Sequence, residues 1–132
     1  MPTPDMLELA ATVEAIRPML PSKDFETSRR FYEELGFRPQ VLNNELVEMH
    51  MGKFSFILQN YYVKEWADNF VFHVRVSDVK VWWARITSLD LGRRYGINTV
   101  APRPESWGLV AGFVDPSGVL WRIAAALPSN GK

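Results

Sequence analysis

The sequence predicts an α+β fold built from two tandem βαβββ repeats. An extended apolar segment, an Asp and an amphipathic helix that ends at Gly occur twice, at 14–36 and 69–92. Each helix is followed by three strand-like stretches separated by turn residues. One such repeat leaves a face of its sheet uncovered. We therefore expect the two sheets to curve around a shared concave cavity, with the helices on their outer faces.

The first helix is predicted to begin after Asp24, which is a good N-cap, with Glu26 adding a favourable negative charge to the first turn. Gly36 supplies the position after the helix where a positive φ is needed. The face that packs on the sheet has apolar or small residues at spacings of three and four. These residues are Phe25, Ser28, Phe31, Tyr32 and Leu35.

The second helix follows the same pattern, with Asp78 as its cap and Gly92 as its end. Its apolar stripe is formed by Val79, Trp82, Trp83, Ile86 and Leu89. At helical spacing, large side chains of this kind are typical of core packing. We therefore expect the two tryptophans to pack in the core and not to bind a cofactor.

Turn residues divide the remaining sequence into strands. After the first helix, turns are expected at 43–44 and 52–53. After the second, a loop is expected at 102–106 and a turn at 115–118, where Asp-Pro-Ser-Gly is a strong turn signal. Residues 60–69 read as a polar and aromatic linker.

These boundaries predict a single domain at 14–128, with the first repeat at 14–60 and the second at 69–126. Residues 1–13 form an N-terminal extension to which the sequence assigns no role. Tyr61, Tyr62 and Trp66 in the linker are expected either to line a cavity mouth or dimer contact, or to pack within a long loop.

Composition excludes several classes of protein. Fifteen basic and fifteen acidic residues give a formal net charge of zero, which argues against a nucleic-acid partner. The chain has no cysteine, so disulfides and thiol chemistry are excluded. No signal peptide or stretch of 18 apolar residues is evident, so we expect a cytoplasmic protein without a membrane partner.

The order of these motifs resembles the vicinal oxygen chelate superfamily, which includes glyoxalase I, extradiol dioxygenases and bleomycin resistance proteins. The resemblance is carried by "FYEELGF" at 31–37 and "ESWGLVAGFVDPSGVLWRIA" at 105–124, and it extends over about residues 14–125. Within the superfamily, the chain looks most similar to the bleomycin resistance type, whose Trp-Gly pair corresponds to Trp107 and Gly108. The resemblance implies a homodimer that binds a small molecule.

Metalloenzymes of this superfamily bind a divalent ion through side chains of the first and last strand of each repeat. Carried over to this sequence, the resemblance places Arg17, Val71 and Arg122 at three of these positions, and Phe56 or Ile57 at the fourth. Arginine offers only donors, and the others offer no ligand atom. We therefore expect neither a metal nor another cofactor, although a shift of one residue would bring His73 nearer the centre.

Strand alternation predicts which side chains share the inward face. Val71, His73 and Arg75 fall on one side of their strand, opposite Phe72 and Val74. Together with Trp107 beside the Pro-rich loop, the inward residues form the predicted ligand site. Its members are Arg17, Met19, Glu48, His50, His73, Arg75, Trp107 and Arg122.

Such a basic surface suits an anionic small molecule, because Arg binds carboxylate and phosphate through two parallel hydrogen bonds. The same arginines could instead close the site by pairing with Glu48 or Glu14. The leading hypothesis is a metal-free binding protein for an anionic metabolite or an antibiotic. A lyase or isomerase with His73 as general base is one alternative, and an interaction or regulatory module is another.

Overall fold

The computed structural model describes residues 3–126, and the predicted domain end at 128 lies outside the described residues. Two modules follow one another along the chain. The elements up to the middle of the chain are α1 (Pro4–Ala11), β1 (Met19–Pro21), α2 (Phe25–Leu35), β2 (Arg38–Asn43), β3 (Leu46–Met51) and β4 (Phe54–Gln59). The remaining ones are α3 (Lys64–Asn69), β5 (Val71–Arg75), α4 (Val79–Ser88), α5 (Leu91–Tyr95), β6 (Thr99–Glu105), β7 (Gly108–Val114) and β8 (Leu120–Ala126).

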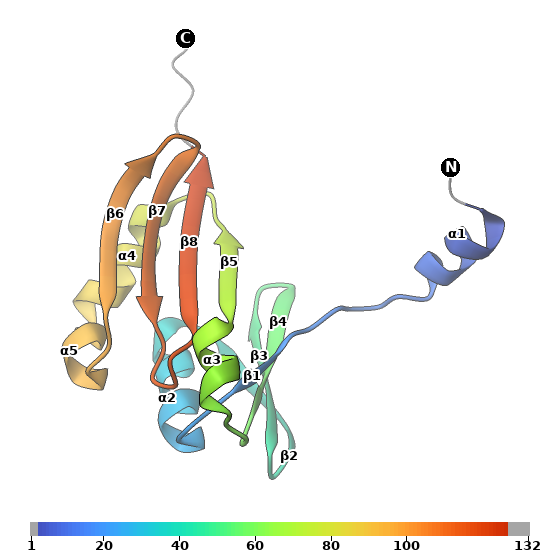
Figure 1. The fold of residues 1–132 in the computed structure, drawn as a ribbon, viewed down its shortest axis with the longest axis horizontal. Coiled ribbons are helices and arrows are strands. Elements are labelled where there is room, and N and C mark those ends of the chain that lie inside the picture. Colours follow the sequence, from blue (N-terminus) through green and yellow to red (C-terminus); the bar gives the residue numbers. More distant parts are fainter. Residues whose placement is uncertain (1–2, 127–132) are drawn as a thin grey trace.

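Each module contributes one four-stranded sheet with the same topology (Figure 1). The strand order is β1-β4-β3-β2 in the first sheet and β5-β8-β7-β6 in the second. In both, the outer strand that precedes the helix pairs in parallel and the other pairs are antiparallel. The predicted α+β duplication of a βαβββ repeat is confirmed, and the two sheets do not close into one barrel.

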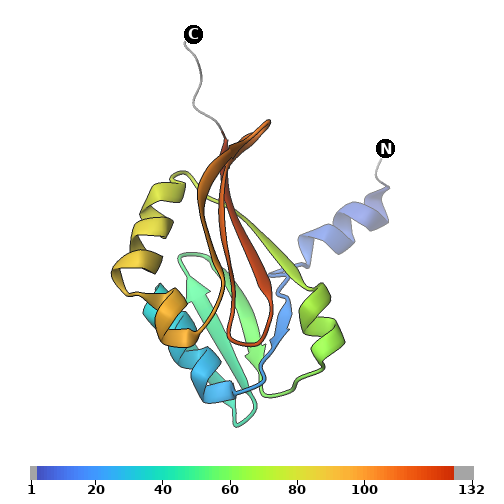
Figure 2. The ribbon, with the colours of Figure 1, turned by 60° about the vertical axis from the view of Figure 1, so that its left-hand side comes forward.

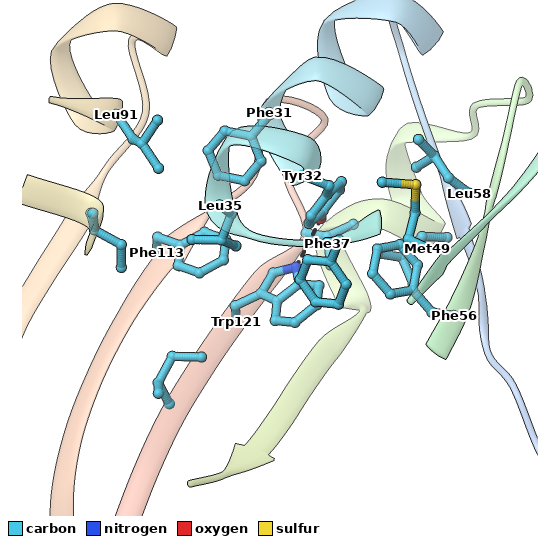
Figure 3. Packing of buried hydrophobic residues seen from close by; sticks show 14 of the residues in the cluster. Phe31, Tyr32, Leu35, Phe37, Met49, Phe56, Leu58, Leu91, Phe113 and Trp121 are labelled. Atoms are coloured by element: carbon cyan, nitrogen blue, oxygen red, sulfur yellow. Dashed lines mark hydrogen bonds between the residues drawn. The ribbon is translucent and has the colours of Figure 1, made fainter. Parts of the chain in front are cut away.

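A single apolar core joins the two modules (Figure 3). Its centre is aromatic, and α2 contributes to both sides of it. Phe31 packs on Phe113 of β7 with ring centroids 5.5 Å apart, and Tyr32 packs on Phe56 of β4 at 4.9 Å. Trp121 of β8 stacks on Phe113, also at 5.5 Å. The helix therefore connects the two sheets instead of covering only its own.

A buried polar network also joins the modules. Tyr32 donates a hydrogen bond to the Asp115 carboxylate and accepts one of 2.9 Å from the indole nitrogen of Trp121. The backbone N–H groups of Ser117 and Val119 donate to the same carboxylate, which fixes the Asp-Pro-Ser-Gly turn. The network therefore ties α2 of the first module to the β7–β8 turn of the second.

Burial changes the acidity of both groups in this network. Burial raises the pKa of Tyr32 well above its usual range, and the adjacent Asp115 charge and hydrogen bond raise it further. Burial also raises the pKa of Asp115, although hydrogen bonds from Tyr32 and the turn backbone act in the opposite direction. Both groups therefore favour their protonated forms more strongly in the folded protein than in the unfolded chain.

The helix starts at Asp24 and Asp78 are as predicted, since both carboxylates accept hydrogen bonds from the first turn. The predicted end of the second helix was wrong. α4 ends at Ser88, and Gly92 lies inside the short helix α5, which ends at Gly96 with φ of 63°. The left-handed conformation is adopted not by Gly92 but by Asp90, between the two helices, and by Gly96, after α5.

Three segments differ from the predicted loops and strands. The linker at 60–69 contains the helix α3, and the predicted loop at 102–106 lies largely within β6. Prolines are tolerated in β6 because it is an edge strand with an irregular register between Val100 and Arg103. The first strand, expected over 14–20, is confined to Met19–Pro21.

The N-terminal extension forms a helix that lies away from the rest of the chain in both views (Figures 1 and 2). Thr3 caps α1, and Pro4 occupies its first turn, where the missing N–H costs nothing. No residue of α1 is buried, and Met6, Leu7 and Leu9 are exposed. Among residues 3–126, no helix is long and apolar enough to cross a lipid bilayer.

Candidate functional site

The register of the two sheets shows which positions correspond between the modules. Arg17 lies beside Ser55, because its Nε donates a 2.6 Å hydrogen bond to the Ser55 hydroxyl. In the second sheet, His73 pairs with Arg122 in the same parallel arrangement. Counted from the helix caps Asp24 and Asp78, Arg17 corresponds to Val71 and Met19 corresponds to His73. The strand partners of Met19 and His73, which are Ile57 and Arg122, therefore also correspond.

In the first module the polar side chains neutralise one another. Arg17 Nε lies 2.6 Å from Glu48 Oε2, which also accepts a 3.0 Å hydrogen bond from Ser55. His50 Nε2 lies 3.4 Å from the same oxygen. The Glu48 side chain is only 11% exposed, so its charge is held mainly by these three groups. The expected pairing of Arg17 with Glu48 is confirmed, and Met19 lies on the next strand position, partly exposed.

In the second module the corresponding face carries unpaired cations. Within the described residues, neither Arg75 nor Arg122 makes a salt bridge or a side-chain hydrogen bond. His73 packs its ring against Trp107, whose centroid is 5.9 Å away, and it has no hydrogen-bond partner that would orient it as a base. Trp107 is half exposed. This face can therefore present cationic groups and an aromatic ring to a ligand.

Glycine keeps the space over Arg122 open. Gly112 pairs with Arg122 at the position that Glu48 occupies opposite Ile57. A Cβ at Gly112 would lie 2.8 Å from the carbonyl oxygen of Trp121, so a side chain there would force the strands apart. A shallow cavity of about 100 Å³ lies over this glycine and Arg122.

A larger cavity of about 520 Å³ lies between the two modules. The first module contributes Met51, Phe54 and Phe56 to its lining, and the second contributes Phe72, Val74 and Trp82. Ser55, His73 and Arg75 provide its polar atoms. Phe72 and Val74 of β5 point toward the core and are partly exposed here. Leu20 on the equivalent strand β1 is fully buried.

The predicted site residues therefore form two groups, one on each sheet, and only His73 and Arg75 of them line this cavity. Arg17, Glu48 and His50 lie together on the first sheet, and His73, Arg75 and Arg122 lie on the second, with Trp107 next to His73. The sequence reasoning missed the apolar residues between them. The available signal in the sequence was Phe54 and Met51, two large apolar residues on either side of the turn at 52–53. In the structure Phe54 is 70% exposed, which is unusual for a Phe unless something covers it.

The residues at the metal positions do not fit a divalent cation. Arg17 and Arg122 cannot ligate a metal, and the one carboxylate, Glu48, is already engaged by a guanidinium. No group of three His, Asp or Glu side chains suited to a metal occurs among residues 3–126.

The fold is similar to that of solved bleomycin-binding proteins. A bleomycin resistance determinant encoded on transposon Tn5 matches with 25% identity and a TM-score of 0.72, covering 88% of this chain and 100% of that one. A bleomycin-binding protein complexed with bleomycin matches with 25% identity and a TM-score of 0.70, covering 87% and 100%.

Enzymes share the fold as well. Lactoylglutathione lyase from Agrobacterium tumefaciens matches with 16% identity and a TM-score of 0.63, covering 86% of this chain and 95% of that one. No family model and no curated protein sequence matches the chain. The fold of the chain is therefore similar to that of bleomycin resistance and glyoxalase proteins, as the resemblance to the vicinal oxygen chelate superfamily predicted.

Proposed function

We propose that this chain is a metal-free small-molecule binding protein that holds its ligand in the cavity between its two modules. The observation that carries the proposal is the cavity of about 520 Å³, lined by both modules and mainly by apolar side chains. Ligand sites are usually concave, apolar and within the range of about 300–1,000 Å³, with a few polar groups that fix orientation. The bleomycin complex of a structural neighbour supports ligand binding on this fold.

The absence of a suitable metal-ligand set supports binding rather than chelate chemistry. Guanidinium groups occupy positions where metalloenzymes of the superfamily place ligands, and Glu48 is neutralised by Arg17. His73, the candidate general base, has no orienting hydrogen bond within the described residues. We propose residues 14–128 as the ligand-binding domain.

The test uses the neutral fluorescent probe N-phenyl-1-naphthylamine, whose emission rises in an apolar site. Titration of the full-length protein should give saturable binding of one probe per chain. Val74→Phe should weaken binding at least tenfold, because Val74 lines the cavity. Met51→Trp, on the opposite wall, should do the same, so the test does not depend on one variant folding well.

The matched control is Val71→Phe, the same change on the same strand but on the opposite face. It should leave probe affinity within about twofold, while circular dichroism and urea unfolding confirm that each variant is folded. Absence of saturable binding, or equal binding by all variants, would contradict the proposed function.

We further propose that the protein is a homodimer and that α1 contacts the second copy. The helix is fully exposed on its own chain, yet it carries Met6, Leu7 and Leu9 on a well-capped helix. An isolated helix of eight residues is marginal in water, so its stability requires a packing partner. Light scattering should show a dimer for the full chain and a monomer for a chain lacking residues 1–12, whereas a monomeric full chain would contradict this arrangement.

A further inference from the structure

The ionisable side chains that line the cavity between the modules are all basic. Of the twelve residues that line it, none is acidic, and Arg75 and His73 are the ones that can carry positive charge. The nearest carboxylate in the hydrogen-bond network, Glu48, bonds to Ser55 but is already paired with Arg17. The lining side chains that can carry a charge are therefore basic, not acidic.

Arg75 lines the cavity and has no bonded partner for its guanidinium among the described residues. It belongs to the edge strand β5, is exposed, and forms no ion pair or side-chain hydrogen bond with another described residue. A guanidinium can donate two parallel hydrogen bonds to a carboxylate or sulfonate, and such charge-assisted bonds are about twice as strong as neutral ones. A free arginine beside an apolar cavity favours a ligand with one anionic group.

The rest of the cavity lining is largely aromatic. Phe72 lies between Phe56 and Trp121, with centroid distances of 5.6 Å and 4.2 Å, and Trp82 lines the same cavity from α4. Phe72 and Trp82 remain partly exposed. Aromatic faces bind planar rings through offset stacking and edge contacts in addition to apolar burial.

We propose that the ligand of this cavity is a planar, apolar ring system with one anionic group, and that Arg75 is the residue that selects the anion. The inference rests on the proposed function and names the class of ligand for the same site. The ring system packs against Phe72 and Trp82, and the anionic group accepts hydrogen bonds from Arg75.

Two fluorescent probes measure the contributions of the anionic group and of the ring system to binding separately. N-phenyl-1-naphthylamine is neutral, and 1-anilinonaphthalene-8-sulfonate has the same rings with an added sulfonate. Arg75→Gln in the full-length protein should weaken binding of the sulfonate probe about tenfold, as expected for loss of a charge-assisted hydrogen bond. The same variant should leave the neutral probe within about twofold. Raising the salt concentration should weaken only the sulfonate probe.

Arg122→Gln is the matched control, because Arg122 is the other unpaired arginine on this sheet but does not line the cavity. It should leave both probes within about twofold. A loss of sulfonate affinity in Arg122→Gln but not in Arg75→Gln would overturn the assignment, as would equal effects of Arg75→Gln on both probes. If neither probe bound in the cavity, the proposed function itself would fail, so the two failures can be distinguished.

Discussion

The first module pairs Arg17 with Glu48, whereas Arg122 on the second sheet pairs with no acid among the described residues. Counted from the helix caps, Ile57 corresponds to Arg122, and their strand partners Glu48 and Gly112 correspond as well. Gly112 in place of the acid leaves Arg122 without a counter-ion opposite it and leaves space above it. The same backbone thus closes one polar face internally and leaves the other open to a ligand.

The comparison also extends to the strands at the boundary between the modules. Leu20 of β1 is completely buried, but Phe72 and Val74 of β5 are partly exposed to the cavity. A duplicated fold can therefore keep its framework while equivalent strands of its two copies differ in exposure. The following changes test this difference, from the largest expected effect to the smallest.

Tyr32→Phe should weaken the buried hydrogen-bond network that connects the two modules. It removes the donor to buried Asp115 and the acceptor for the Trp121 indole. Leaving buried polar groups unsatisfied costs about 1–3 kcal/mol, so we expect a loss near 2–3 kcal/mol in the free energy of unfolding, measured with urea. Tyr61→Phe, at an exposed tyrosine, is the control and should change stability by less than about 0.5 kcal/mol.

Glu48→Gln should open the closed face of the first module. The change leaves Arg17 without a counter-ion and is expected to cost about 1–2 kcal/mol, a value reduced because Arg17 is partly exposed to solvent. Glu33→Gln breaks an exposed pair with Arg29 and should cost less than about 0.5 kcal/mol. Equal effects of the two changes in urea unfolding would show that the Glu48 network is not stabilising.

Alkaline pH should lower the stability of the folded protein through Tyr32. Because burial raises the pKa of Tyr32 in the folded protein, the unfolded chain loses this proton first as the pH rises above about 10. The folded state then binds more protons, so stability falls by up to about 1.4 kcal/mol per pH unit in this window. Unfolding curves at pH 9–11 should show the decline in the wild type, and Tyr32→Phe should lack this contribution. An identical decline in both proteins would contradict the role of Tyr32.

Arg122→Gln should have the smallest effect on stability. Arg122 is exposed and unpaired within the described residues, so its removal should change the free energy of unfolding by less than about 0.5 kcal/mol. The contrast with Glu48→Gln is the sharpest test of an open face against a closed one. A loss of more than 1 kcal/mol in Arg122→Gln would show that the second face is also closed by an interaction.

The sequence was sufficient to predict the duplicated frame. Asp24 and Asp78 mark the helix starts, and the alternation of β5 correctly separates His73 and Arg75 from Phe72 and Val74. Thr3 followed by Pro4 was an overlooked signal for α1. The two prolines of β6 suggested a loop, because a sequence does not show that a strand lies at a sheet edge.

The candidate site was less accessible to sequence reasoning. The pairing of His73 with Arg122 depends on strand register, which a single strand's alternation does not specify. The large cavity depends on how the two modules meet, since its lining comes from elements far apart in the chain. Only the structure shows that Phe54 and Phe72 face the same space.

A crystal structure of the protein with 1-anilinonaphthalene-8-sulfonate tests the central claim most directly. We predict the ring system in the cavity between the modules, against Phe72 and Trp82, with the sulfonate within about 3 Å of the Arg75 guanidinium. A probe bound against Arg17 on the first sheet, or beside Trp107 with the cavity left empty, would contradict it.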